Sequence, residues 1–196
     1  MQYQLQYQYD AVLLSLRSSL GAVLSEKLGW PLHEGDIFHS QANIEKMSRG
    51  EQLTDEDRMP WLLQLHEVIQ RERSSGSSAF VTCSALKSLY RQILLHGSRA
   101  LHQHFLPPVP TDVFFIFLHG DYSLIQQRMV SRRGHYMKAD LLHSQFNVLE
   151  SPLDEENVLS HDITRDINDI ATDVHRHIMS LGLITEGNTS FSTAAD

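Results

Sequence analysis

The stretch Val113-Phe-Phe-Ile-Phe-Leu118 is a run of apolar residues with no polar position between them. Such a run is typical of a parallel β-strand that helices cover on both faces. Two further strand candidates, Ala79-Phe-Val-Thr-Cys83 and Val158 to Ile163, alternate along the chain with segments of helical periodicity. This alternation predicts an α/β fold, in which a parallel β-sheet is flanked by helices.

The helical segments are marked by apolar residues at helical spacing and by residues typical of helix ends. The clearest follows Thr54, a predicted N-cap with the acidic turn Asp55-Glu56-Asp57 behind it, and runs to Ser74. Residues 96–112 hold several prolines and no period, so a loop is expected there. The remaining helices are expected at residues 18–28, 86–95, 121–132, 139–148 and 166–181.

Length and composition limit the class of protein. The 196 residues and 41% hydrophobic content suit one core, so we expect one domain over residues 18–181 and a disordered tail at 182–196. The net charge of −8 argues against nucleic acid or an anionic membrane as a partner. No apolar run approaches the roughly 20 residues of a membrane span. The single cysteine, Cys83, fits a reducing compartment, and together these features predict a soluble, cytoplasmic protein.

The N-terminal segment, residues 1–17, is atypical for a buried sheet. Glutamine alternates with tyrosine or leucine from Gln2 to Tyr9, which fits a half-buried strand and a disordered, biased tail equally well. The apolar run from Ala11 to Leu16 fits either a strand or the start of a helix. The start of the chain is therefore the least determined part of the predicted fold.

The segment from Asp36 to Trp61 is dense in charged and amide side chains, which suit a small polar ligand better than a core. Ligands of parallel sheets bind beyond the carboxyl ends of the strands, and here those ends are expected to carry Asp36, Ser84 and His119. The Asp36 carboxylate would accept the proton of a substrate hydroxyl or hold a metal ion through water. An exposed turn residue is the alternative.

Positively charged side chains near this segment are candidates for binding an anion. The planar fork of Arg58 suits bidentate capture of a carboxylate, with a surface ion pair in the first helical turn as the alternative. Lys87 and Arg91, one turn apart, would add charge to the same site or lie on a solvated helix face. Arg128 and Arg132 share a helix face, which suits both phosphoryl transfer and a plain basic helix end.

These residues fall into motifs that resemble those of the gluconate kinases (gluconokinases), a family of small P-loop kinases. The motifs argue against another small-molecule kinase of similar fold, such as shikimate kinase. The matching positions run in order through residues 18–181: Gly35-Asp36, His39, Asn43, Lys46-Met47, Gly50, Leu53, Asp55, Asp57-Arg58, Pro60-Trp61-Leu62, Cys83-Ser-Ala-Leu-Lys87, Tyr90-Arg91, Leu118, Gly120, Arg128, Arg132, Gly134-His135, Met137, Ser144-Gln145-Phe146 and Leu149-Glu150.

The resemblance implies a P-loop kinase fold and phosphorylation of the 6-hydroxyl of D-gluconate. It implies that Asp36 orients or deprotonates this hydroxyl and lies close to Mg²⁺, and that Arg58 holds the gluconate carboxylate. The further substrate-binding residues that it implies are His39, Lys87 and His135. D-Gluconate is thus the implied small-molecule partner, and a homodimer is left open.

The resemblance also implies the second substrate, ATP, with Mg²⁺ as its cofactor. Arg128 and Arg132 would be catalytic residues of a lid at about residues 128–138 that closes over the phosphates. A neutralising pair of guanidiniums fits the negative charge that is spread over the transferring oxygens.

The N-terminal segment departs from the family pattern Gly-x-x-Gly-x-Gly-Lys-Ser-Thr. Aligning the end of this pattern with Ser18-Ser19 places Arg17 at the lysine, and the three glycine positions hold Ala11, Leu14 and Leu16. Glycine reaches the backbone conformations that wrap phosphate with successive N–H groups, whereas leucine there is strained and apolar. Arg17, Ser18 and Ser19 are thus a degenerate remnant of the nucleotide-binding loop, with Ser18 at the position of a Mg²⁺ ligand.

We infer that the first segment of a gluconokinase, including its phosphate loop, has been replaced in this chain. Negligible ATP-dependent turnover is therefore expected. The alternative function is that of a catalytically inactive, gluconate-binding variant of the family.

Overall fold

The computed structural model describes residues 3–7, 13–102, 105–130 and 139–182. Within these ranges, one sheet of parallel strands has the order β2-β3-β1-β4-β5. Residues Val113 to Leu118 are buried, as expected for a strand that is covered on both faces. The parallel sheet is therefore confirmed, and its strands are β1 (Tyr3–Tyr7), β2 (Leu32–Glu34), β3 (Phe80–Cys83), β4 (Val113–His119) and β5 (Val158–Asp162).

The N-terminal strand β1 occupies the centre of the sheet. Its backbone pairs with β3 on one side and with β4 on the other, so that Leu5 lies opposite both Val81 and Phe115. Of the two alternatives for the glutamine-alternating segment, the strand is confirmed over residues 3–7. Residues 8–12, between β1 and the first helix, lie outside the described ranges.

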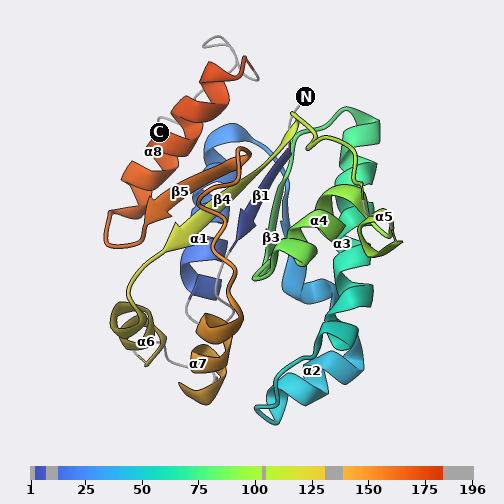
Figure 1. Cartoon of the computed structure of the whole chain (residues 1–196). Coiled ribbons are helices and arrows are strands. Elements are labelled where there is room, and N and C mark those ends of the chain that lie inside the picture. Colours follow the sequence, from blue (N-terminus) through green and yellow to red (C-terminus); the bar gives the residue numbers. More distant parts are fainter. Residues whose placement is uncertain (1–2, 8–12, 103–104, 131–138, 183–196) are drawn as a thin grey trace, which may run out of the picture.

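Helices cover both faces of the sheet (Figure 1). On one face α1 (Leu13–Leu28) packs against α8 (Ile167–Ser180), and on the other α3 (Asp55–Ser75) packs against α4 (Ser88–His96), which continues to the short α5 (Arg99–His102). Large apolar side chains fill both layers, and each contributes roughly 1.5–3 kcal/mol when fully buried. The largest fully buried ones include Trp61, Tyr90, Phe80, Phe115, Leu20 and Leu24.

A third group of helices lies beyond the carboxyl ends of the strands, where the site is expected. Figure 1 shows α2 (Gln41–Ser48) at one side of this end and α6 (Tyr122–Val130) with α7 (Ala139–Val148) at the other. The 3₁₀ helix η1 (Gly35–Phe38) follows β2 directly and contacts β3 and α3.

The long helix α3 begins and ends as its sequence predicts. Thr54 is the N-cap, and its hydroxyl accepts a hydrogen bond from the Asp57 N–H while the Asp57 carboxylate accepts one from the Thr54 N–H, which completes a capping box. Gly76 ends the helix in the left-handed conformation with φ of 72°, a conformation that glycine adopts without strain.

Three sequence expectations differ from the structure. Helix α1 begins at Leu13 rather than at Ser18, so the apolar run from Ala11 to Leu16 is resolved in favour of a helix from Leu13 onward. The expected loop at 96–112 contains α5, and the polar segment after Asp36 contains α2, whose N-cap Ser40 accepts a hydrogen bond from the Asn43 N–H. Ser40 is therefore the local sequence signal for the start of α2, because serine is a preferred N-cap residue.

Two expectations fall largely outside the described residues: the disordered tail, from residue 183 onward, and the lid, at residues 131–138. In the parts of the chain that the structure describes, no helix is both long enough and apolar enough to cross a membrane.

Candidate active site

Asp36 lies directly after β2, at the carboxyl end of the sheet, as predicted. The neighbouring Gly35 is buried against β3, and a Cβ atom at this position would lie 2.2 Å from the backbone oxygen of Thr82. The indole N–H of Trp61 donates to the Gly35 carbonyl over 2.7 Å. The backbone of η1 is thus held between β3 and α3, and it carries the half-buried Asp36 to the sheet edge beside α3.

His39 is brought to the same place by an aromatic contact. Its imidazole stacks on the indole of Trp61, with ring centroids 4.4 Å apart and 14° between the planes. The Nδ1 atom of His39 lies 3.4 Å from the amide nitrogen of Asn43. Trp61 therefore positions two parts of the site. Its N–H holds the Gly35-Asp36 backbone, and its ring holds His39.

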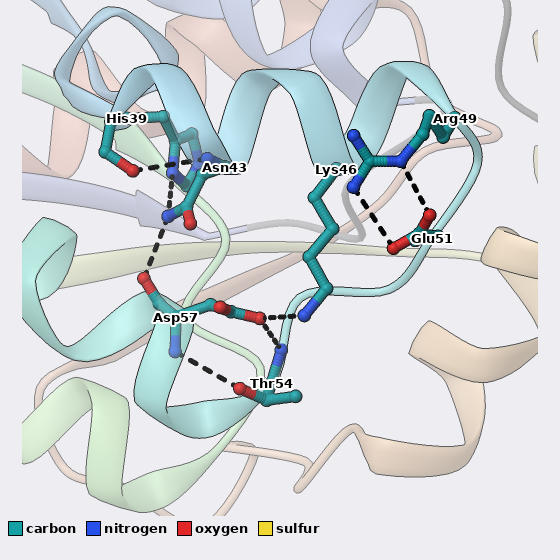
Figure 2. Close-up of polar contacts among 8 residues, drawn as sticks. His39, Asn43, Lys46, Arg49, Glu51, Thr54 and Asp57 are labelled. Atoms are coloured by element: carbon teal, nitrogen blue, oxygen red, sulfur yellow. Dashed lines mark hydrogen bonds and ion pairs between the residues drawn. The ribbon is translucent and has the colours of Figure 1, made fainter.

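Many polar side chains of the segment between Asp36 and Trp61 form hydrogen bonds and ion pairs within the segment (Figure 2). The buried Asn43 amide donates to the Asp57 carbonyl over 2.8 Å, and the Lys46 ammonium lies 2.5 Å from the Asp57 carboxylate. This lysine contact, and next the hydrogen bond from the Thr54 N–H, lower the pKa of Asp57 to about 2. Asn43, Lys46 and Asp57 thus join α2 to the start of α3, which explains part of the polar density without a ligand.

Arg58 faces a second polar group, formed at the starts of α3 and α4. Its side chain is largely buried, and its guanidinium carbon lies 5.9 Å from the centroid of the Tyr90 ring. The Lys87 ammonium lies 5.6 Å from the same centroid and 2.8 Å from both carboxylate oxygens of Asp55. We call Arg58, Lys87, Asp55 and Tyr90 the cation cluster.

The charges of the cation cluster support one another. Hydrogen bonds from Lys87 and then from Tyr90 lower the pKa of the Asp55 carboxyl, and Asp55 in turn raises the pKa of Lys87. Burial and then the Asp55 carboxylate raise the pKa of the Tyr90 phenol, against an opposing influence of Arg58. At neutral pH the cluster therefore holds two cations, one anion and a neutral phenol.

Arg91 neither belongs to the cation cluster nor lies on a solvated helix face, so both sequence predictions for it are wrong. Its guanidinium is 1% exposed and donates to Glu155 from two nitrogens, over 2.8 and 2.5 Å. It also donates to the carbonyls of Ala85 and Glu150, over 3.1 and 3.0 Å. Arg91 thus ties the turn after β3 to residues 150–155 from inside the protein.

Arg128 lies on the other side of the same sheet end, in the last turn of α6. It is close enough to Asp162, at the end of β5, to help lower the pKa of that carboxyl, although the hydrogen bond from the Thr164 N–H is the largest cause. The structure therefore groups Asp36, His39, Arg58 and Lys87 at the β2–β3 side and places Arg128 at the β5 side. The predicted residues Arg132 and His135 lie outside the described ranges.

Comparison with known proteins decides the family. The probable gluconokinase of Rattus norvegicus is 39% identical over 164 residues, which are 81% of this chain and 89% of the relative. The chain belongs to the gluconokinase family. The thermosensitive gluconokinase of Escherichia coli K12 is 37% identical over 165 residues, 84% of this chain and 80% of the relative.

A solved structure agrees with this membership. The gluconokinase from Sinorhizobium meliloti 1021 superimposes with a TM-score of 0.75 at 32% identity, and the match covers 92% of this chain and 93% of that one. The P-loop kinase fold is thereby confirmed. No protein-family model matches the chain.

The nucleotide side is the part in which this chain departs from the pattern of its family. Arg17, Ser18 and Ser19 lie within helix α1 and not at its start, and Leu14 and Leu16, at the positions of two loop glycines, are helical as well. The described ranges hold no group of three or more His, Cys, Asp or Glu residues that could bind a metal ion. Mg²⁺ in kinases is held largely by phosphate oxygens and water, so Asp36 fits as a single oxygen donor to it.

Asp55 and Tyr90 are the two members of the cation cluster that the sequence analysis did not predict as site residues. Both residues stand at positions of the family motifs. The available signal was the spacing of Asp55 and Arg58, three residues apart and hence on one face of α3.

Proposed function

We propose that this chain acts on D-gluconate as a gluconokinase, by ATP-dependent phosphorylation to 6-phospho-D-gluconate. The observation that carries the proposal is the largely buried Arg58, which shares the Tyr90 ring with Lys87 and lies on helix α3, the helix that contacts the 3₁₀ helix η1 bearing Asp36. A cationic group and a carboxylate on neighbouring elements suit a substrate with an acid at one end and a reacting hydroxyl at the other.

The proposed substrate contacts follow from the charge of each group. Arg58 binds the gluconate carboxylate with its planar fork, and Lys87 adds a second positive charge. Asp36 accepts the proton of the 6-hydroxyl as this oxygen attacks. His39, held flat against Trp61, contacts the polyol chain, and His135 is a predicted further contact.

The proposed phosphoryl side uses Arg128 and Arg132 to neutralise the transferring group. ATP supplies the phosphoryl group, and Mg²⁺ reduces the charge on its oxygens. Ser18 and Asp36 are the proposed Mg²⁺ neighbours, and Arg17 and Ser19 the remaining nucleotide contacts. Because the chain has no glycine before Gly21, we expect turnover far below the roughly 1–100 per second of kinases.

Gluconate binding without turnover is the second candidate function. The observation that favours it is the helical conformation at Leu14 and Leu16, where the family has loop glycines. A phosphate-wrapping loop needs backbone conformations that leucine avoids.

Calorimetric titration of the purified chain with D-gluconate and, separately, with ATP and Mg²⁺ tests these proposals, together with a coupled assay of ADP release. Gluconate binding with measurable ADP release supports the kinase, and gluconate binding alone supports the second candidate. Failure to bind gluconate would overturn both. The cytoplasmic location and the homodimer stay predictions, and light scattering after size exclusion tests the latter.

A further inference from the structure

Asp55 contacts two members of the cation cluster at once. We propose that Asp55 is a positioning residue of the sugar-acid site: it holds the Lys87 ammonium and the Tyr90 hydroxyl beside Arg58, so that both cations face one substrate carboxylate. This inference deepens the proposed function and rests on it for the identity of the ligand.

The geometry places Asp55 at the junction of two helices. Asp55 is the first residue of α3, and Lys87 is the N-cap of α4. Both carboxylate oxygens of Asp55 lie 2.8 Å from the Lys87 nitrogen. A lysine side chain has several rotatable bonds and no fixed direction of its own, so this two-oxygen contact determines where its charge lies.

The Tyr90 hydroxyl is oriented by the same carboxylate. It donates its proton to Asp55 Oδ1 over 2.5 Å, and because a phenol has one proton, its oxygen is left to act as an acceptor. Tyr90 is fully buried, and the centroid of its ring lies 5.9 Å from the Arg58 guanidinium carbon and 5.6 Å from the Lys87 ammonium. The enclosed phenol oxygen is thus left as an acceptor for the Arg58 guanidinium.

Charge counting points to the class of ligand. Arg58 and Lys87 carry two positive charges and Asp55 one negative charge, so the cation cluster keeps one positive charge. That charge matches a single carboxylate and gives no preference for a neutral polyol. Because the charge of Asp55 by itself lowers the attraction for an anion, its proposed contribution to selecting a sugar acid over the corresponding sugar alcohol lies in where it holds the Lys87 ammonium and the Tyr90 hydroxyl.

The test compares Asp55→Asn with Glu56→Gln. Asp55→Asn keeps an oxygen that can accept from Tyr90 but removes the partner of Lys87. Glu56 is an exposed acid in the same helical turn, so Glu56→Gln removes the same charge beside the cluster. Calorimetry without nucleotide measures the Kd of D-gluconate and of D-glucitol, the neutral polyol of equal chain length.

We expect Asp55→Asn to weaken gluconate binding by about tenfold to a hundredfold, with glucitol unchanged, and Glu56→Gln to change neither by more than about twofold. The gluconate-to-glucitol preference is the readout that a merely structural role would not move. Gluconate binding by Asp55→Asn within about twofold of the wild type would overturn the proposal, as would equal losses for both ligands.

A second measurement needs no ligand. The chain contains four lysines, Lys27, Lys46, Lys87 and Lys138, so the ¹³C-methyl NMR signals of the reductively methylated protein can be titrated individually and Lys87 assigned with Lys87→Arg. We expect the pH midpoint of the Lys87 titration to fall toward the ordinary lysine value in Asp55→Asn and to stay unchanged in Glu56→Gln. An unchanged midpoint contradicts the role of Asp55, whereas a wild type that fails to bind gluconate but shows this shift contradicts only the proposed function.

Discussion

The segment from Gly35 to Leu62 and the N-terminal segment from β1 to α1 are held in the fold by different means. In the first, side chains bind one another and the backbone: Trp61 donates to Gly35, and Asn43 and Lys46 contact Asp57. In the second, the backbone of β1 pairs with β3 and β4, and α1 packs against α8. A strand can thus occupy the centre of a sheet through main-chain pairing although the residues that follow it lack the glycine pattern of the family's nucleotide-binding loop.

The largest expected effect comes from restoring the sequence of the nucleotide-binding loop. The combined changes Ala11→Gly, Leu14→Gly, Leu16→Gly and Arg17→Lys rebuild the glycine-and-lysine pattern. We expect turnover to rise from negligible to roughly 1–100 per second, measured by coupled ADP release with D-gluconate. Two of the glycines fall within α1, where each disfavours the helix by roughly 1 kcal/mol and so favours a loop.

The matched control carries the same three glycine changes with Arg17→Ala. It should fold like the restored variant, as judged by circular dichroism, and stay inactive. Equal activity of the two variants, or fast turnover of the unaltered chain, would show that the N-terminal segment does not limit the reaction.

Arg91 gives the next largest effect, on stability. Arg91→Met should lower the free energy of unfolding by about 3–5 kcal/mol, because it leaves the Glu155 carboxylate and buried carbonyls without their donor. Urea denaturation measures the change. Arg176→Met, at an arginine whose side chain is 72% exposed, should stay within about 0.5 kcal/mol of the unaltered chain.

Arg58→Met sharpens the distinction between a binding and a structural arginine. It should weaken gluconate binding by roughly tenfold to 150-fold, the range of a hydrogen bond to a charged group. Calorimetry measures this loss. The control Arg71→Met, toward the far end of α3, should bind gluconate normally, and a similar loss in both variants would remove Arg58 from the carboxylate site.

The smallest expected effect is a pH dependence of the α2–α3 junction. The pKa of Asp57 is lowered from 3.8 to about 2, so ionised Asp57 stabilises the fold above about pH 4, and this contribution is lost as the pH falls toward 2. Thermal unfolding from pH 2 to 7 should therefore show an advantage of the unaltered chain over Asp57→Asn that disappears in acid. Lys46→Met should reduce the same advantage, and a difference that is constant over this range would contradict the junction.

The sheet could be predicted from the sequence because its apolar runs and helix caps are local signals. Val113 to Leu118 needed no tertiary information, and Thr54 marked the start of α3 correctly. The start of α1 could not be predicted in the same way. Its apolar run suits a strand and a helix alike, and the choice depends on which segment of the chain completes the sheet.

The sequence predicted which residues could form the site, but it did not predict which side chains those residues contact. Arg58 and Arg91 look alike in the sequence, and only the packing places one beside Lys87 and Tyr90 and the other against Glu155. Glu155 lies 64 residues from Arg91, so helical spacing carried no information about their contact. Asp55 was missed for a related reason, since its partners come from another helix.

The close approach of Gly35 to the carbonyl of Thr82 has a consequence for altering the substrate range. The close approach of the two backbones and the Trp61 hydrogen bond to the Gly35 carbonyl set where Asp36 emerges. The neighbouring side chains other than Trp61 can therefore be redesigned for longer, shorter or differently substituted sugar acids while the reacting carboxylate stays where it is. Residues 35 and 61 are the positions in that neighbourhood that a library should leave untouched.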